Sequence, residues 1–250
     1  MQTLEFAGVA GAAITDLGGA FMTDEQTDKL GADHGLDQAS FYGLGRAAVL
    51  GDAPPAVVAS AYPFIDPGLV MAVYSGAVEK LSARDAVDVY AEACQDWGRR
   101  NLGDLEGIDR LSELLESIVD AAPGYWGPLF AGWRAVPLPD DAAGRVGQLL
   151  HVGRELRGAM HVAALLNSDL SPVEAVMVSG GAEAMAQYLW PEPYPDPEPL
   201  RASHEALQAK TDEMFGEASA AIDAESRSEL AGLLSAAVNH VAVPNEPGVG

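Results

Sequence analysis

The sequence predicts a mainly α-helical protein, and three observations support this. Apolar residues recur at spacings of three or four along most of the 250-residue chain, which is the period of a helix. Runs of alternating apolar and polar residues are nearly absent, which leaves room for a small hairpin at most. Helix-capping residues precede several of the periodic stretches, as where Ser82 is followed three residues later by Asp85.

The first recognisable group of helices lies between residues 40 and 74. One helix ends at Gly51, a suitable C-cap, and a second begins near Pro54 and Pro55, where proline fits the first helical turn. A third starts after Asp66, a good N-cap residue. Three short helices joined by tight turns are typical of a helix-turn-helix-like unit.

A second unit of the same kind is predicted over residues 148–180. A long helix runs to Leu166, a turn follows, and another helix begins at Ser171 and Pro172. The helices predicted in the rest of the chain span residues 82–97, 104–122, 144–167, 200–219 and 224–240.

Two irregular stretches interrupt the helices. Residues 123–140 hold four prolines and four aromatic residues, and such a loop either packs as a buried connector between domains or covers a ligand site as a lid. Residues 191–199, PEPYPDPEP, are expected to form an extended linker or an exposed loop.

We therefore expect three segments. Residues 1–80 hold the first helix-turn-helix-like unit, and residues 81–140 hold the connecting helices and the aromatic loop. Residues 141–250 hold the second unit, whose tail from Pro244 is expected to fray.

The composition excludes several classes of protein. Asp and Glu number 37 against 14 Lys and Arg, so the net charge is −23. Neither nucleic acid nor an anionic membrane is expected as a partner, because both require a basic face. A single cysteine, Cys94, excludes a disulfide framework and multi-cysteine metal sites.

No targeting segment and no cofactor site is predicted. No basic residue precedes Lys29, so no signal peptide is visible and a cytoplasmic protein is expected. Asp52 and Asp66 interrupt the most apolar stretch well before it reaches the length of a membrane span. The glycine pairs at residues 18–19 and 180–181 lack the context of a dinucleotide site and are interpreted as turns, so no cofactor is expected.

Neither predicted unit offers a helix suited to reading DNA. Recognition helices present Arg, Lys, Asn or Gln to the bases. The helix after Pro67 begins with GLVMAV, and the segment after Val178 contains GGAEAM. The sequence therefore predicts that DNA binding has been lost, with a transcriptional regulator as the second alternative.

The stretch from Phe41, FYGLGRAAVLGDAPPAVVASAYPFIDPGLV, resembles the signature of an actinobacterial family of winged helix-turn-helix-like proteins. The members are mostly uncharacterised, and some are encoded in antibiotic biosynthetic clusters. GPLFAGWRAVPLPDD and RELRGAMHVAALL are similar to two further blocks, so the resemblance covers most of residues 20–216. It implies two degenerate winged-helix-like units. Leu156, Ala159 and Met160 replace the family's histidine, aspartate and glycine, which puts any chemistry of that block in doubt.

One helix carries an unusual concentration of positive charge. Residues 145–161, RVGQLLHVGRELRGAMH, have a formal charge of +2 because Glu155 is their only acid. Apolar residues surround the helix on nearly all sides, which is typical of a buried helix. Buried arginines must be paired or face a cavity. The basic residues of this helix are Arg145, His151, Arg154, Arg157 and His161.

Two interpretations of these residues stay open. In the first, carboxylates pair with Arg154 and Arg157, and backbone carbonyls satisfy the histidines. In the second, the cations line a pocket for an anionic or polar-aromatic ligand, since guanidinium groups bind carboxylate and phosphate in bidentate fashion. The alternative for Arg46 is a clamp to Asp66 or Asp52. The predicted ligand contacts are Arg154, Arg157, His161, His151, Arg46, Tyr42, Tyr125, Trp126 and Trp133.

The sequence thus predicts a small-molecule-binding protein on a helix-turn-helix-like scaffold. A homodimer is expected only if the apolar stripes of the connecting helices are not buried internally. The first alternative is an enzyme of natural-product or small-metabolite metabolism, with His161 as general acid or base and Glu155 orienting it. No metal site is expected, because Arg154 lies between His151 and His161 and would repel a cation.

Overall fold

In the computed structural model, which describes residues 1–242, the chain forms twelve α-helices, several short 3-10 turns and no strand. The all-α prediction is confirmed. The small hairpin that the sequence left open does not form within these residues, so the helix-turn-helix-like units there carry no β wing. The predicted fraying from Pro244 concerns residues outside the described range.

Nine helices match those expected from the sequence, and three were not singled out: two at the N-terminus and a short one in the aromatic loop. The bounds are α1 (Thr3–Ala20), α2 (Glu25–Asp33), α3 (Gln38–Ala47), α4 (Pro55–Ser60), α5 (Pro67–Val78), α6 (Ala83–Leu102), α7 (Ile108–Ala121), α8 (Pro128–Arg134), α9 (Ala142–Leu166), α10 (Pro172–Gln187), α11 (Arg201–Ala218) and α12 (Ala224–Ala242).

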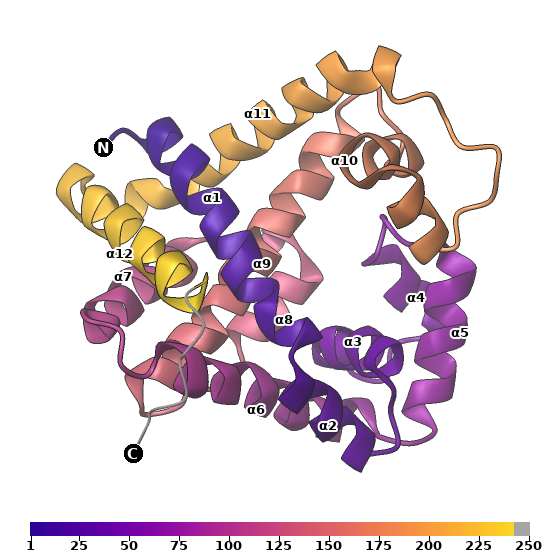
Figure 1. Ribbon diagram of the computed structural model, residues 1–250, viewed down its shortest axis with the longest axis horizontal. Helices are drawn as coiled ribbons and strands as arrows, with labels where there is room; N and C mark the ends of the chain where they lie inside the picture. Colours follow the sequence, from indigo (N-terminus) through magenta and orange to yellow (C-terminus); the bar gives the residue numbers. More distant parts are fainter. Residues whose placement is uncertain (243–250) are drawn as a thin grey trace.

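Helix α9 forms the centre of the protein and is crossed by α1 (Figure 1). Glycines set how closely its neighbours approach. A Cβ on Gly18 of α1 would overlap the carbonyl oxygen of Leu150, and one on Gly147 would overlap that of Cys94 in α6. The glycine pair at residues 18–19, interpreted as a turn, instead lies inside α1, because tight packing against α9 requires small residues there.

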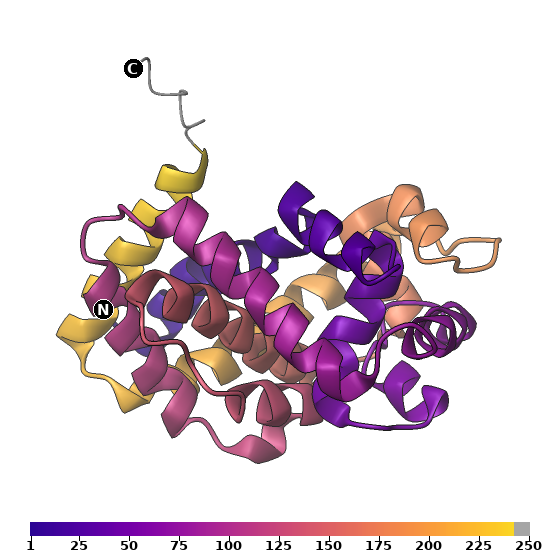
Figure 2. The ribbon, with the colours of Figure 1, turned by 90° about the horizontal axis from the view of Figure 1, so that it is seen from below.

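The first helix-turn-helix-like unit forms as the sequence predicts. Gly51 adopts a φ of 67°, which favours glycine after the preceding turn. Pro55 begins α4, and the Asp66 carboxylate caps α5 by accepting a hydrogen bond from the Leu69 backbone N–H at 3.0 Å. Helices α3, α4 and α5 lie at one end of the molecule, opposite α7 and α12 (Figure 2).

The second unit consists of α9, a turn and α10. Ser171 and Glu174 form a capping box at the start of α10. Gly181, with φ 65°, is a kink within α10 rather than a turn between elements. Beyond α10, the chain joins the first unit: the Trp190 indole N–H donates to the Phe64 carbonyl oxygen at 3.0 Å.

The N-terminal helix is apolar because it is buried against the core. Residues Thr3–Thr23 are long and apolar enough to cross a membrane by length and composition alone, yet 56% of that window is buried inside the protein. Phe6, Ile14 and Leu17 supply its contacts with the main core. A helix that packs against a protein core has the same composition.

The two stretches expected to be irregular differ from each other. In the first, Pro128 begins α8, whose Phe130 and Trp133 are buried, so this stretch is partly helical. Residues 191–197 form no helix and are largely exposed or half-buried, as predicted for the proline-rich loop.

One main cluster of buried apolar residues extends from Phe6 to Ala237, through all three predicted segments. The three predicted segments therefore share one core, and the boundaries between them stay predictions. The apolar stripes of α6 and α7 are buried in this cluster. A homodimer was expected only if these stripes were not buried internally, so the two helices give no reason to expect one.

Candidate functional site

A cavity of about 540 Å³ lies where the first unit, the aromatic loop and α9 meet. Its size falls within the range of small-molecule sites. Part of its wall is apolar, formed by Phe64, Trp126 and Phe130, and part is charged. The charged residues that line it are Arg46, Arg154, Glu155 and Arg157.

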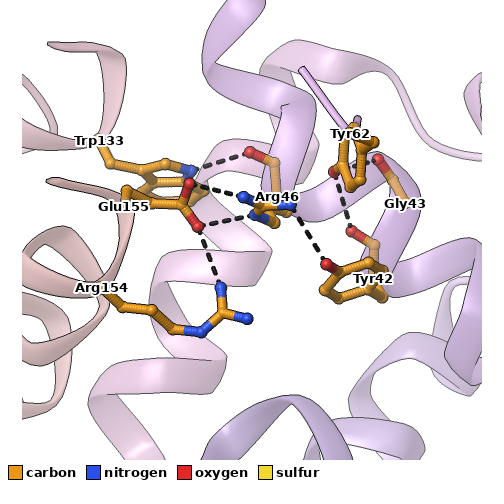
Figure 3. Close-up of polar contacts among 7 residues, drawn as sticks. All are labelled: Tyr42, Gly43, Arg46, Tyr62, Trp133, Arg154 and Glu155. Atoms are coloured by element: carbon orange, nitrogen blue, oxygen red, sulfur yellow. Dashed lines mark hydrogen bonds and ion pairs between the residues drawn. The ribbon is translucent and has the colours of Figure 1, made fainter. Parts of the chain in front are cut away.

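Arg46 of α3 and Glu155 of α9, which both line the cavity, form a bidentate ion pair (Figure 3). Arg46 Nε lies 2.7 Å from Glu155 Oε1, and Nη2 lies 2.9 Å from Oε2. The Glu155 side chain is only 2% exposed. The predicted clamp of Arg46 to Asp66 or Asp52 is wrong, because Asp66 caps α5 and the α9 carboxylate reaches Arg46 instead.

Neighbouring aromatic residues hold the Arg46 side chain in place (Figure 3). Its Nη1 donates to the Tyr42 hydroxyl at 3.2 Å, and its guanidinium carbon lies 4.7 Å from the centroid of the Tyr62 ring, within reach of a cation–π interaction. Trp133 Nε1 donates to the Arg46 carbonyl oxygen at 2.9 Å, and the Tyr62 hydroxyl donates to the Gly43 carbonyl oxygen at 3.0 Å.

Glu155 stays ionised despite its burial. Burial alone would raise the pKa of its carboxyl group, but the charge and hydrogen bonds of Arg46, helped by Arg154, lower that pKa to about 2. In Arg46, burial would lower the pKa, and Glu155 more than compensates. The pair is therefore a permanent link between α3 and α9 at neutral pH.

Arg154 and Arg157 each make one side-chain hydrogen bond within residues 1–242, but only Arg157 has a carboxylate to itself. Arg154 Nη1 donates to Glu155 Oε1 at 3.3 Å, its only hydrogen bond within residues 1–242, and its side chain is 25% exposed. A guanidinium has five N–H donors, so most of those of Arg154 are free. Arg157 Nη2 donates to Asp212 Oδ1 at 2.9 Å, so that carboxylate offsets its charge, whereas Arg154 shares Glu155 with Arg46.

Glycines of α1 make room for both arginines. A Cβ on Gly19 would lie 3.1 Å from Arg154 Nε, and a Cβ on Gly11 would lie 2.7 Å from Arg157 Nε. The Arg157 Nε is buried and has no hydrogen-bond partner in the described part of the chain. The long side chains of α9 thus run across the backbone of α1 before they reach the cavity.

The cavity is cationic within a strongly acidic protein. Three arginines and one carboxylate line it, a formal charge of +2, and Asp212 beside Arg157 reduces this to +1. The whole chain carries −23. A positive cleft with low-dielectric walls concentrates anions.

His161 lines the cavity, and its contact with Thr211 assigns its tautomer. The Thr211 hydroxyl lies 2.9 Å from the Leu207 carbonyl oxygen and 3.0 Å from His161 Nδ1. Because a carbonyl oxygen can only accept, we assign the hydroxyl proton to the bond with Leu207 and the imidazole proton to Nδ1. Nε2 then carries the lone pair. Burial, reinforced by the charge of Arg157, lowers the pKa of His161 to about 4, so the ring is neutral at pH 7.

The predicted arrangement in which Glu155 orients His161 does not form. Glu155 is held by Arg46 and Arg154, and Thr211 orients the imidazole instead. Glu155 and His161 therefore do not form a catalytic pair.

Three predicted ligand contacts lie away from the cavity. His151 is fully buried among the rings of Trp133, Phe21 and Tyr90, and burial lowers its pKa to about 3. Neither of its ring nitrogens has a partner in residues 1–242, so the backbone carbonyls expected in the first interpretation are also missing. Trp133 is buried behind Arg46, and Tyr125 is 82% exposed.

The other predicted contacts share the cavity: Tyr42, Arg46, Trp126, Arg154, Arg157 and His161. Sequence analysis missed Tyr62, Phe64 and Tyr188, which also line it. Tyr62 and Phe64 lie in the sequence block that resembles a known family, and that resemblance was the one signal that could have pointed to them. Tyr188 follows α10, and only the tertiary fold brings it to the site.

Tyr188 lines the same cavity as Tyr42 and Arg154. Burial raises the pKa of its phenol, Tyr42 raises it further and Arg154 lowers it.

A comparison with known families identifies the scaffold. The model of a helix-turn-helix family matches residues 8–198, which include both predicted units and most of the cavity wall. The chain belongs to this helix-turn-helix family. No curated protein and no solved structure matches it.

As a helix-turn-helix protein, the chain is unusual in what its candidate recognition helices present. In α5 the exposed positions include Gly68, Met71, Ala72, Ser75 and Gly76. Neither α5 nor α10 contains a lysine or an arginine.

Proposed function

We propose that this helix-turn-helix protein binds a small anionic or polar-aromatic metabolite in the cavity between its first unit and α9. The observation that carries the proposal is the free guanidinium of Arg154, which faces a cavity of net positive charge in a chain of −23. Its remaining N–H donors are suited to a carboxylate or phosphate. Arg157 and His161 contribute secondary contacts.

In this proposal the scaffold is a degenerate winged-helix-like one, without a β wing in residues 1–242, and it houses the ligand instead of DNA. Resemblance to actinobacterial proteins from antibiotic biosynthetic clusters supports a natural-product-like ligand. A cytoplasmic location is part of the same proposal. The partner is thus a small molecule, with neither nucleic acid nor membrane involved.

Family membership favours a transcriptional regulator as the second candidate. A regulator must contact phosphates with basic side chains, and α5 and α10 have none. The ligand-binding role therefore has the stronger support.

An enzyme that uses the same cavity has less support. General acid–base catalysis works best when the catalytic pKa lies near the working pH. The pKa of His161 is lowered to about 4 by burial, so at pH 7 the ring is a weak base and holds no proton on Nε2 to donate. These properties suit a hydrogen-bond acceptor in a binding site.

Native mass spectrometry of freshly purified protein tests the proposal. We expect a mass above that of the polypeptide in the wild type and its loss in Arg154→Ala. Arg110→Ala is the matched control, because Arg110 is exposed, pairs with Glu113 and Glu229, and does not line the cavity. An added mass that survives Arg154→Ala, or a wild type that neither carries nor takes up any anion, contradicts the proposal.

A further inference from the structure

One end of the cavity offers hydrogen-bond donors to a ligand. Arg154 has free N–H groups and a single hydrogen bond, to Glu155, within residues 1–242. The Tyr42 hydroxyl oxygen accepts from Arg46 Nη1, which leaves its own proton available. Tyr188 adds a second phenol to the wall of the same cavity. This combination of a cation and two hydroxyls fits a carboxylate.

The other end offers an acceptor. The bond from Nδ1 to Thr211 leaves His161 Nε2 as an unprotonated nitrogen. Asp212 offsets the charge of the nearby Arg157. A group that donates a proton, such as a hydroxyl, is therefore suited to His161 Nε2.

Geometry along α9 sets the distance between the two ends. Arg154 and His161 are seven residues apart, about 10 Å along the axis and within about 20° of the same face of the helix. The wall between them includes the rings of Phe64 and Trp126, and the Phe64 ring lies 5.4 Å from that of His161. Aromatic walls favour a flat apolar body between the polar groups.

We infer that the ligand is an elongated aromatic carboxylate with a hydroxyl at the end opposite its carboxylate. The carboxylate accepts from Arg154, Tyr42 and Tyr188, and the hydroxyl donates to His161 Nε2. This inference rests on the proposed function, since it specifies the ligand of the same cavity. A volume of about 540 Å³ accommodates a molecule of one or two rings.

Isothermal titration of four probes at pH 7.5 tests the inference. The probes are 4-hydroxycinnamate, cinnamate without the hydroxyl, 4-methoxycinnamate whose ether oxygen cannot donate, and the methyl ester of 4-hydroxycinnamate. With wild-type protein we expect 4-hydroxycinnamate to bind about two- to ten-fold more tightly than cinnamate or the methoxy compound, the range of one neutral hydrogen bond. The ester should bind about 10- to 100-fold more weakly, because a charge-assisted contact is lost.

Variants assign each effect to a side chain. In His161→Phe the preference for the hydroxyl should disappear, and in Arg154→Gln the preference for the free acid over its ester should shrink. The methoxy comparison needs only wild-type protein, so it decides the role of the hydroxyl even where a variant folds poorly.

The outcomes separate this inference from the proposed function. Equal binding of the hydroxy and methoxy compounds, or an unchanged hydroxyl preference in His161→Phe, overturns the inference, while Arg154-dependent binding of the acids still supports the proposed function. If none of the four probes binds the wild type, the inference is wrong, and native mass spectrometry decides separately whether another anion occupies the cavity.

Discussion

Replacing Glu155 with glutamine measures what the buried ion pair contributes to stability. The substitution keeps the size of the side chain and removes its charge. Arg46, whose side chain is 15% exposed, then loses its bidentate partner inside the protein. Because the pair joins α3 to α9, its loss weakens the attachment of the first unit.

The magnitude follows from the pKa of Glu155. Its ordinary value of 4.5 falls to about 2 in the folded protein, which corresponds to about 3 kcal/mol of folding free energy. Removing one partner of a buried pair costs about 3–5 kcal/mol. We therefore expect Glu155→Gln to lose roughly 3–5 kcal/mol at pH 7.

The pH dependence has a definite sign. The folded-state pKa is lowered, so the contribution of Glu155 is complete above pH 4.5 and is lost as the pH falls from 4.5 toward 2. The wild type should lose this stability across that window, and Glu155→Gln should not.

Urea unfolding followed by circular dichroism at pH 7 and at pH 3 measures both effects. Glu113→Gln is the control, since Glu113 is 66% exposed and pairs with Arg110 at the surface, where ion pairs contribute little. The double variant Arg46→Met with Glu155→Leu should recover part of the loss, because the more buried cation, Arg46, is removed together with its partner and only the 25% exposed Arg154 is left without a carboxylate. Equal unfolding midpoints for Glu155→Gln and Glu113→Gln at pH 7 would refute the reasoning.

Three further predictions concern other parts of the molecule. The pKa of His151 is lowered from 6.5 to about 3 by burial, so the wild type should lose stability as the pH falls from 6.5 toward 3. An acid titration of His151→Leu should lack this loss of stability, and identical titration curves for the two proteins would contradict the prediction. Gly18→Ala should lower the thermal midpoint because its Cβ meets the Leu150 backbone, whereas Gly8→Ala in the same helix, with open space around it, should not; equal midpoints would argue against close α1–α9 packing. Electrophoretic assays at physiological salt should detect no binding to duplex DNA, and a salt-dependent shift at sub-micromolar protein would favour the regulator.

Local signals in the sequence were sufficient to locate most helices. Pro55, Asp66 and Ser171 each mark a helix start that the structure reproduces, because capping and proline effects depend only on adjacent residues. Helix α1 was not singled out, since its glycines are poor helix formers. These glycines are required because α1 packs closely against α9, and that contact is a feature of the tertiary structure.

For the site, the sequence alone determined that α9 is buried and basic, and therefore that its arginines need carboxylates or a cavity. It could not determine which arginine takes which carboxylate. Glu155 pairs with Arg46 across 109 residues of chain, and Asp212 pairs with Arg157 across 55. Hydrogen-bonded ion pairs require contact distances, so only the folded arrangement of distant segments decides that Arg154 is the arginine without a carboxylate to itself.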